Sequence, residues 1–286
     1  MHGSMVAPRI AIVGHVEHVT LGRISGIPGP GDILYLREPC FLPGGGGGIA
    51  FAQLCRSEAE IHLYTAVGSD EAGRAVAARL ASAAPRIHIH AVVRAVAHPR
   101  VVVMIDDNGQ RTIVVTESPL QPAASDPLPW SILASCDAVY FTGADPETLR
   151  YARAARRLVV TARRSSVIRA AAVVPDVIIG SCSDPRENAP FATYEPRPGA
   201  LVLTDGPRAI RIFAASGPAE VDPPPAPVRV VGDYGAGDSF AGALTYFLAH
   251  GLSVAEACRR AGLYGAAVLR GVSPLEMQLA LVAPQR

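Results

Sequence analysis

The most informative segment of the sequence reads Val230-Val231-Gly232-Asp233-Tyr234-Gly235-Ala236-Gly237-Asp238-Ser239-Phe240, and an apolar run from Ala241 to Leu248 follows it. Small residues at 235–237 allow a tight backbone turn, and the apolar run predicts that a helix starts there. At such a start, unpaired N–H groups and the positive end of the helix dipole face outward together. The segment therefore predicts a binding site for an anion.

Asp238 falls in the first turn of this predicted helix, beside the anion site. In that position its carboxylate can accept a proton from a hydroxyl that attacks a bound phosphate. A simpler interpretation is that the glycines only form a loop and that Asp238 caps the helix. The first interpretation predicts phosphoryl transfer, and the second predicts no function.

The longer pattern D-Y-G-A-G-D-S-F-x-G resembles the C-terminal signature D-T-x-G-A-G-D of the ribokinase-like (PfkB) carbohydrate kinases. In that family the final Asp is the catalytic base and the G-A-G amides form an anion hole. The resemblance therefore implies that Asp238 is the general base and that Gly235, Ala236 and Gly237 form the anion hole. Tyr234 is one of the departures from the family pattern.

Composition narrows the classes of function. Hydrophobic residues make up 49% of the 286 residues and the net charge is +1, so nothing indicates a surface for nucleic acid or for an acidic partner. We therefore expect a small-molecule substrate. No apolar run is long enough to span a bilayer, and we expect a cytoplasmic protein without a membrane partner.

Three residue types bear on the chemistry. The sequence contains no lysine, which excludes a Walker A phosphate loop and a Schiff-base mechanism, so a phosphate must be met by arginine or a metal ion. His88 and His90 share one face of a predicted strand, but no third ligand is near in the sequence and we interpret them as ordinary strand residues. The five cysteines lack metal-site spacing and fit reduced thiols.

The chain after Pro129 alternates short apolar runs with helix-like stretches. This alternation predicts a doubly wound α/β fold, with a mainly parallel sheet and helices on both faces. We expect one domain over residues 1–286, with ligands beyond the carboxyl ends of the strands. The expected strands are 138–141, 158–160, 177–179, 200–203 and 210–214, and the expected helices are 146–157 and 165–173.

Two segments read as β-hairpins. The first covers residues 21–42 and includes an alternating run, Asp32 to Leu36; the second covers residues 100–115, with the turn signal Asn108-Gly109 between β-branched runs. The second resembles an insert of the same kinase family, in which two inserts form a small β-sheet lid. The resemblance implies lid inserts at roughly 15–42 and 92–118, and it leaves open a homodimer through the lid.

The resemblance also extends to the N-terminal half. Arg9–Val13 reads as a strand that leads into a ligand-facing loop, 14–19, where family members carry an acid that holds substrate hydroxyls. Glu17 is the nearest match, and a solvated loop acid is an equally good interpretation. The glycine-rich turn at residues 44–48 matches the family at Gly44 and Gly45.

The residue after this turn is the main departure on the substrate side. Ile49 stands where the sugar kinases have a substrate-binding Asn. We expect Ile49 to offer only apolar contact, so that the glycine N–H groups hold the substrate. This departure favours a nucleoside or a partly apolar acceptor over ribose or fructose.

The resemblance places the nucleotide and its metal at later strand ends. Asp184 and Glu187 are the candidates for the family's acid that acts on Mg²⁺ through water, and a turn at Asp184 is the alternative. Thr204 and Gly206 resemble the family's T-x-G that lines the nucleotide. Asp233 is assigned to the same cofactor site, and Arg163 to a phosphate or an anionic substrate, with surface solvation as the alternative.

Together these features predict an enzyme that moves the γ-phosphoryl group of ATP to a hydroxyl of a sugar, nucleoside or related small molecule. The resemblance implies ATP and Mg²⁺ as cofactors and leaves a monovalent cation open. A nucleotide- or metabolite-binding module that has lost turnover is the alternative. A dinucleotide-dependent oxidoreductase ranks last, because the glycines lack the G-x-G-x-x-G spacing after a strand.

Overall fold

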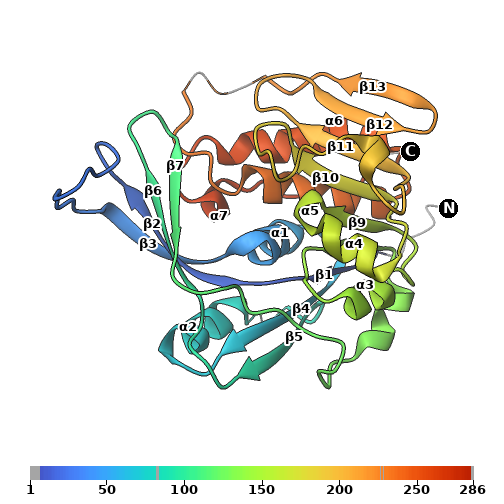
Figure 1. Ribbon diagram of the computed structural model, residues 1–286, viewed down its shortest axis with the longest axis horizontal. Coiled ribbons are helices and arrows are strands. Elements are labelled where there is room, and N and C mark those ends of the chain that lie inside the picture. Colours follow the sequence, from blue (N-terminus) through green and yellow to red (C-terminus); the bar gives the residue numbers. More distant parts are fainter. Residues whose placement is uncertain (1–6, 82–83, 226, 228, 285–286) are drawn as a thin grey trace.

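The computed structural model describes residues 7–81, 84–225, 227 and 229–284. Within these residues the chain forms a large sheet with helices on both faces, and a small second sheet lies to one side of it (Figure 1). This arrangement confirms the predicted α/β fold. None of the described helices is long and apolar enough to cross a bilayer.

The large sheet has the strand order β13-β12-β11-β10-β9-β8-β1-β4-β5. The strands from β11 to β5 in this order pair in parallel, and β12 and β13 are added antiparallel at one edge. Its strands are β1 (Arg9–Val13), β4 (Glu60–Gly68), β5 (Ile87–Arg94), β8 (Ala138–Phe141), β9 (Leu158–Thr161), β10 (Val177–Ser181), β11 (Ala200–Thr204), β12 (Ile210–Ala214) and β13 (Gly217–Val221).

Alternation along each strand divides the core into two layers. Ile10 and Ile12 of β1 face α1, α5 and α6, whereas Ala11 and Val13 face α3 and α4. The helices are α1 (Gly45–Leu54), α2 (Glu71–Leu80), α3 (Pro146–Ala152), α4 (Ser165–Ala171), α5 (Ala236–Ala249), α6 (Val254–Val268) and α7 (Pro274–Met277), with 3₁₀ turns η1 (Trp130–Ser135), η2 (Ala162–Arg164) and η3 (Phe191–Thr193).

The small sheet has the order β3-β2-β6-β7, from β2 (Glu17–Arg23), β3 (Arg37–Gly44), β6 (Arg100–Ile105) and β7 (Arg111–Val115). One face packs Val19, Leu21 and Val103 against Tyr234 and Ile49 in a cluster of its own. The predicted turn between β6 and β7 is present, with Gly109 at φ +77°. This cluster joins the small sheet to the segment that precedes α5.

Several local predictions were wrong. The run Asp32 to Leu36 is not a strand, because Ile33 and Tyr35 are more than 80% exposed and no strand pairs with the segment. Glu17 to Val19 start strand β2, so the expected loop 14–19 is shorter. The predicted helices 146–157 and 165–173 also end early, at Ala152 and Ala171.

Two further features concern the C-terminal half. The described residues of the segment before α5 form a loop. Gly232 lies against Ile105 of β6 and the Gly271 carbonyl, so the loop is held by packing and not by strand pairing. The antiparallel edge strand β13 was not predicted, since its Pro and Glu residues give a weak strand signal.

Candidate active site

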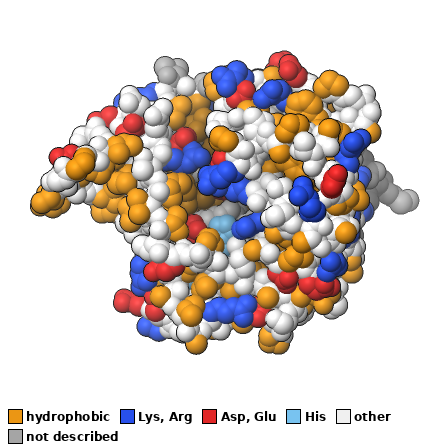
Figure 2. All heavy atoms as spheres, in the orientation of Figure 1, with side chains coloured by type: hydrophobic (Ala, Val, Ile, Leu, Met, Phe, Trp, Pro, Cys, Tyr) orange, Lys and Arg blue, Asp and Glu red, His pale blue; other side chains and the backbone are white. Residues whose placement is uncertain are grey.

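The order in which the chain adds strands to the large sheet reverses between β1 and β8. These two strands are neighbours, but β4 lies on the far side of β1 and β9 on the far side of β8. Such a point leaves a crevice beyond the strand ends, where ligands bind in open α/β sheets. His15 follows β1 and Thr142 follows β8, and Figure 2 shows this face hollowed between the two sheets, with acidic, basic and histidine side chains around the hollow.

Helix α5 points its N-terminus at this crevice. Its first turn is made possible by Gly235, which has φ +81°, and no side chain caps the helix. A β-carbon added at Gly237 would meet nothing within 4 Å. The first N–H groups of α5 therefore lack a side-chain acceptor next to open space, which is the arrangement that binds an anion.

Asp238 lies in the first turn of α5 and is partly buried. A β-carbon added at Gly46 would be 3.3 Å from Asp238 Oδ1 and 3.4 Å from Thr142 Oγ1, so the starts of α1 and α5 meet at this carboxylate. Burial and the charge of Glu187 raise the pKa of Asp238 to about 6, against the opposing effect of Arg111 and Arg163. Such a pKa suits a general base near neutral pH.

The glycines at the start of α1 are used for close packing. Gly45 has φ +77°, and a β-carbon there would lie 2.9 Å from the His15 ring. At Gly47 a β-carbon would lie 2.6 Å from the His15 carbonyl oxygen, to which the Gly47 N–H donates a hydrogen bond of 3.1 Å. The Gly45 N–H faces Tyr234 Oη at 3.4 Å. These N–H groups thus have partners inside the protein.

Glu17 and His15 form the wall opposite Asp238. His15 Nε2 lies 3.7 Å from Glu17 Oε1, and His15 Nδ1 lies 3.4 Å from Thr142 Oγ1. Burial and the nearby Asp238 raise the pKa of Glu17 to about 7. Burial, with the charges of Arg164 and Arg163, lowers the pKa of His15 to about 4, so the imidazole is neutral at pH 7. Glu17 is thus at the crevice, as expected.

Ile49 and Asp233 are placed differently from the other candidates. The Ile49 side chain is fully buried with the core of the small sheet, so in this structure it faces that core and not the crevice. Asp233 pairs with Arg111 of β7 at 2.5 Å through Oδ2, while its buried Oδ1 has no hydrogen-bond partner among the residues that the structure describes. This pair connects the loop before α5 to the small sheet.

The two candidate metal ligands converge on an arginine. Arg163 Nη2 lies 2.7 Å from Asp184 Oδ2, and Arg163 Nε contacts Glu187 Oε1. Arg186 binds Asp184 as well, and its hydrogen bonds are the main cause that holds the Asp184 pKa at about 2. Asp184 and Glu187 therefore share one location, and the Arg163 guanidinium fills the cation position between them.

The candidate nucleotide residues follow β11. Thr204 Oγ1 donates to the Gly180 carbonyl at 3.3 Å, and Gly206, at φ +57°, borders open space. β11 is the second strand from β9 in the sheet, so these residues lie further from Asp238 than the loops after β9 and β10 do.

Sequence reasoning gave no role to three residues that the fold brings to the crevice: His15, Thr142 and Arg164. Arg164 Nε donates to the Thr142 carbonyl at 2.9 Å, which fixes the loop after β8. The available signal was position, because His15 and Thr142 are the first polar residues after two adjacent strands.

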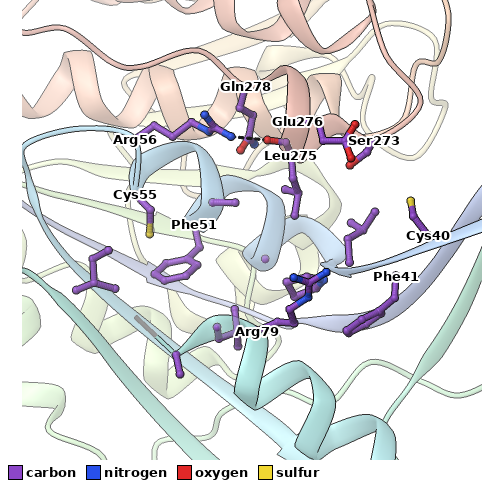
Figure 3. Close-up of a pocket in the computed structure, with 17 residues that line it drawn as sticks. Cys40, Phe41, Phe51, Cys55, Arg56, Arg79, Ser273, Leu275, Glu276 and Gln278 are labelled. Carbon is purple, nitrogen blue, oxygen red and sulfur yellow. Dashed lines mark hydrogen bonds between the residues drawn. The ribbon is translucent and has the colours of Figure 1, made fainter. Parts of the chain in front are cut away.

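A separate pocket lies behind α1, between β3, α2 and α7 (Figure 3). It has a volume of about 680 Å³ and a mainly apolar lining that includes Phe41, Phe51 and Leu275, with Arg56 and Arg79 at its edge. Asp238, His15 and Glu17 do not line it. The pocket is therefore distinct from the crevice at the strand ends.

Comparison with known proteins finds a carbohydrate-kinase sequence pattern over part of the chain and a shared fold over nearly all of it. The sequence pattern of the pfkB family carbohydrate kinases matches residues 180–277. This match includes the segment before α5 and Asp238, and it confirms the resemblance expected from the sequence. No curated protein matches the chain in sequence.

Many solved structures share the fold over nearly the whole chain. A ribokinase from Thermotoga maritima has a TM-score of 0.75 at 15% identity, covering 96% of both chains. An Arabidopsis thaliana ribokinase complexed with ribose and ATP has 0.73 at 17% identity, also over 96% of both chains. Phosphofructokinase-2 from Escherichia coli in complex with potassium has 0.71 at 14%, again over 96% of both.

Proposed function

We propose, from the premise that this chain has the ribokinase-like fold and carries the PfkB pattern over residues 180–277, that it transfers the γ-phosphoryl group of ATP to a hydroxyl of a sugar, nucleoside or related small molecule. The observation that carries the proposal is Asp238, a carboxylate with a pKa of about 6 beside the uncapped start of α5. A base and an anion site next to each other are what phosphoryl transfer needs.

In this mechanism the γ-phosphate of ATP binds at the N–H groups of Gly235, Ala236 and Gly237. The acceptor hydroxyl gives its proton to Asp238 as its oxygen bonds to the γ-phosphorus. The bond from that phosphorus to the bridging oxygen breaks, and ADP leaves with the electron pair. The α5 amides and helix dipole stabilise the charge on the transferred group.

The acceptor lies between the starts of α1 and α5. Glu17 accepts a hydrogen bond from a second acceptor hydroxyl, and His15, neutral and fixed near Thr142, contacts the same molecule. Gly44 and Gly45 shape this wall by letting the backbone approach. Ile49 contributes through the packing under Tyr234, which supports the loop before α5. The small sheet acts as the lid, tied to that loop by Arg111 and Asp233.

ATP extends from α5 toward Thr204 and Gly206, and the ATP-bound ribokinase of the same fold supports this assignment. Asp184 and Glu187 offer the oxygen ligands that Mg²⁺ prefers. The two carboxylates fit the ion, because the Arg163 guanidinium already marks a cation position between them. The Arg163 side chain is 46% exposed, so it is free to turn away from this position toward a phosphate. Bound Mg²⁺ would neutralise charge on the nucleotide phosphates.

A monovalent cation is assigned near Asp233. Its buried Oδ1 has no hydrogen-bond partner, and an oxygen of this kind is a suitable ligand for such a cation. The potassium complex of phosphofructokinase-2 supports this assignment by analogy of fold. We also propose that two copies of the chain form a homodimer through the small sheet. Sedimentation measures the oligomeric state and so tests the homodimer independently of turnover.

The test is ATP consumption with Mg²⁺ against a panel of sugars, nucleosides and sugar acids, with and without K⁺. We expect turnover on one acceptor class in the wild type. We expect none with Glu17→Gln and Asp238→Asn combined, although ATP still binds. ATP binding without turnover on any acceptor would favour the alternative, a binding module that has lost catalysis.

A further inference from the structure

A cluster of histidines lies at the opposite end of the large sheet from the crevice. Glu60 and His62 belong to β4, and His88 and His90 belong to its neighbour β5, with His62 paired opposite His88. Glu60 is the first residue of its strand, so the cluster lies at the amino ends of the parallel strands. The ligand partners that the sequence did not offer near His88 therefore come from the adjacent strand.

Three potential ligand atoms in this cluster are close together. Glu60 Oε1 lies 3.0 Å from His62 Nε2 and 3.7 Å from His88 Nε2, and all three atoms lie within 4.8 Å of one another. Donor atoms that share a tetrahedral Zn²⁺ are separated by about 3.4 Å, because each lies about 2.0–2.2 Å from the metal. A turn of the His88 ring, which is 40% exposed, brings its Nε2 to the shared centre.

His62 is also oriented as a metal ligand is. Its side chain is only 5% exposed, and its Nδ1 lies 3.0 Å from His90 Nε2. A metal-binding histidine commonly donates its second ring N–H to a neighbouring acceptor, which fixes the tautomer.

We propose that Glu60, His62 and His88 bind a divalent transition-metal ion of the zinc class, and that His90 orients His62. Two imidazoles and one carboxylate are a common donor set for zinc and leave a position for water, whereas Mg²⁺ and Ca²⁺ prefer oxygen ligands. β5 is the edge strand of the large sheet. The ion therefore fastens this edge to β4, at a site separate from the crevice.

Arg9 competes with the metal ion. Its Nε lies 3.0 Å from the same Glu60 Oε1, and its Nη2 lies 3.1 Å from Oε2. A metal ion at Oε1 must displace the first contact and accept a guanidinium charge nearby. Removing the Arg9 charge therefore strengthens metal binding at this site. Metal binding by unrelated surface histidines would not depend on Arg9.

Titration with Co²⁺, followed by displacement with Zn²⁺, tests the site in the full chain through visible absorption and the melting temperature. We expect one equivalent to bind and to raise the melting temperature of the wild type. His90→Phe should weaken binding about 10- to 100-fold, and His88→Ala should weaken it further. Arg9→Gln should tighten it. His18→Ala, at a histidine stacked on Phe41 outside the cluster, is the matched control and should change nothing.

Absence of stoichiometric Co²⁺ or Zn²⁺ binding in the wild type would overturn the proposal. Equal losses of metal affinity in His88→Ala and His18→Ala would also overturn the proposal, since they would indicate that scattered histidines bind the metal. Melting curves without metal show whether each variant is folded. His88 is exposed enough for its loss to leave the sheet intact.

Discussion

Helix α1 starts with Gly45 and helix α5 follows Gly235, and the two starts meet at Asp238, yet they are built differently. At α1 the N–H groups of Gly45 and Gly47 face Tyr234 and His15 inside the protein. At α5 no side chain caps the helix, and Gly237 borders open space. Glycine thus permits close packing at α1 and leaves an accessible anion site at α5.

The difference shows that glycine content alone does not identify a binding loop. The five consecutive glycines at residues 44–48 form the longer glycine run, but the N–H groups without a side-chain cap belong to the shorter pattern at 235–237. Substitutions at the two helix starts either remove this difference between α1 and α5 or measure it.

Asp238→Asn removes the base but keeps the shape of the α5 start. We expect kcat to fall about 10²- to 10⁴-fold, with ATP affinity nearly unchanged. The raised pKa of Asp238 means that the ionised carboxylate opposes folding above about pH 6. Asp238→Asn should therefore be more stable than wild type at pH 8, by about 1–3 kcal/mol, and no more stable at pH 4. Steady-state kinetics, ATP titration and denaturant unfolding measure the three quantities.

The control for that variant is Asp107→Asn in the exposed β6–β7 turn, which should keep its kcat. Loss of ATP binding in folded Asp238→Asn would contradict the separation between a base and an anion site.

Glu17→Gln tests the α1 side of the crevice. The carboxylate accepts its hydrogen bond from the acceptor in our mechanism, and a hydrogen bond to a charged group contributes about 1.5–3 kcal/mol. We therefore expect kcat/KM for the acceptor to fall about 10- to 100-fold, with KM for ATP unchanged. An equal rise in both KM values would show that Glu17 supports the fold of the crevice and does not contact the acceptor.

Gly47→Ala and Gly237→Ala compare the two helix starts directly. The new β-carbon at Gly47 would lie 2.6 Å from a backbone carbonyl, so we expect a loss of about 1–3 kcal/mol in the free energy of unfolding. At Gly237 it meets nothing, and stability should stay the same or rise by up to about 1 kcal/mol. Urea unfolding of both variants measures this, and similar values would show that the two starts are not different.

Much of this fold could be predicted because its signals are local. The start of α5, the turn at Asn108-Gly109 and the alternating strands depend on neighbouring residues, and the structure has all three. The placement of Glu17 near Asp238, and of Asp184 and Glu187 beside Arg163, required pairing between distant strands and became clear only in the fold.

Other features had no usable signal in the sequence. Ile49 looked like a substrate contact because of its place after the glycines, but helix α1 already includes those glycines and turns Ile49 into the small-sheet core. Glu60 and His62 are separated in sequence from His88, and only the β4–β5 pairing places them together.

Tyr234→Phe should have the smallest effect. Tyr234 Oη lies 3.4 Å from the Gly45 N–H, a long contact, and the ring remains packed in the small-sheet core. We expect the free energy of unfolding to fall by about 0.5–1.5 kcal/mol, with little change in kcat. A large loss of kcat would show that this hydroxyl, and hence the α1 start, takes part in the reaction.

The measurement that tests the central claim most directly is the pH dependence of kcat/KM for the acceptor, on wild type and on Glu17→Gln. If Asp238 must be ionised to act as the base, the rate falls tenfold per pH unit below about pH 6, and this limb persists in Glu17→Gln. A wild-type profile without a limb near pH 6 would contradict the assignment of Asp238 as the base. Loss of that limb in the Glu17→Gln variant would contradict it as well.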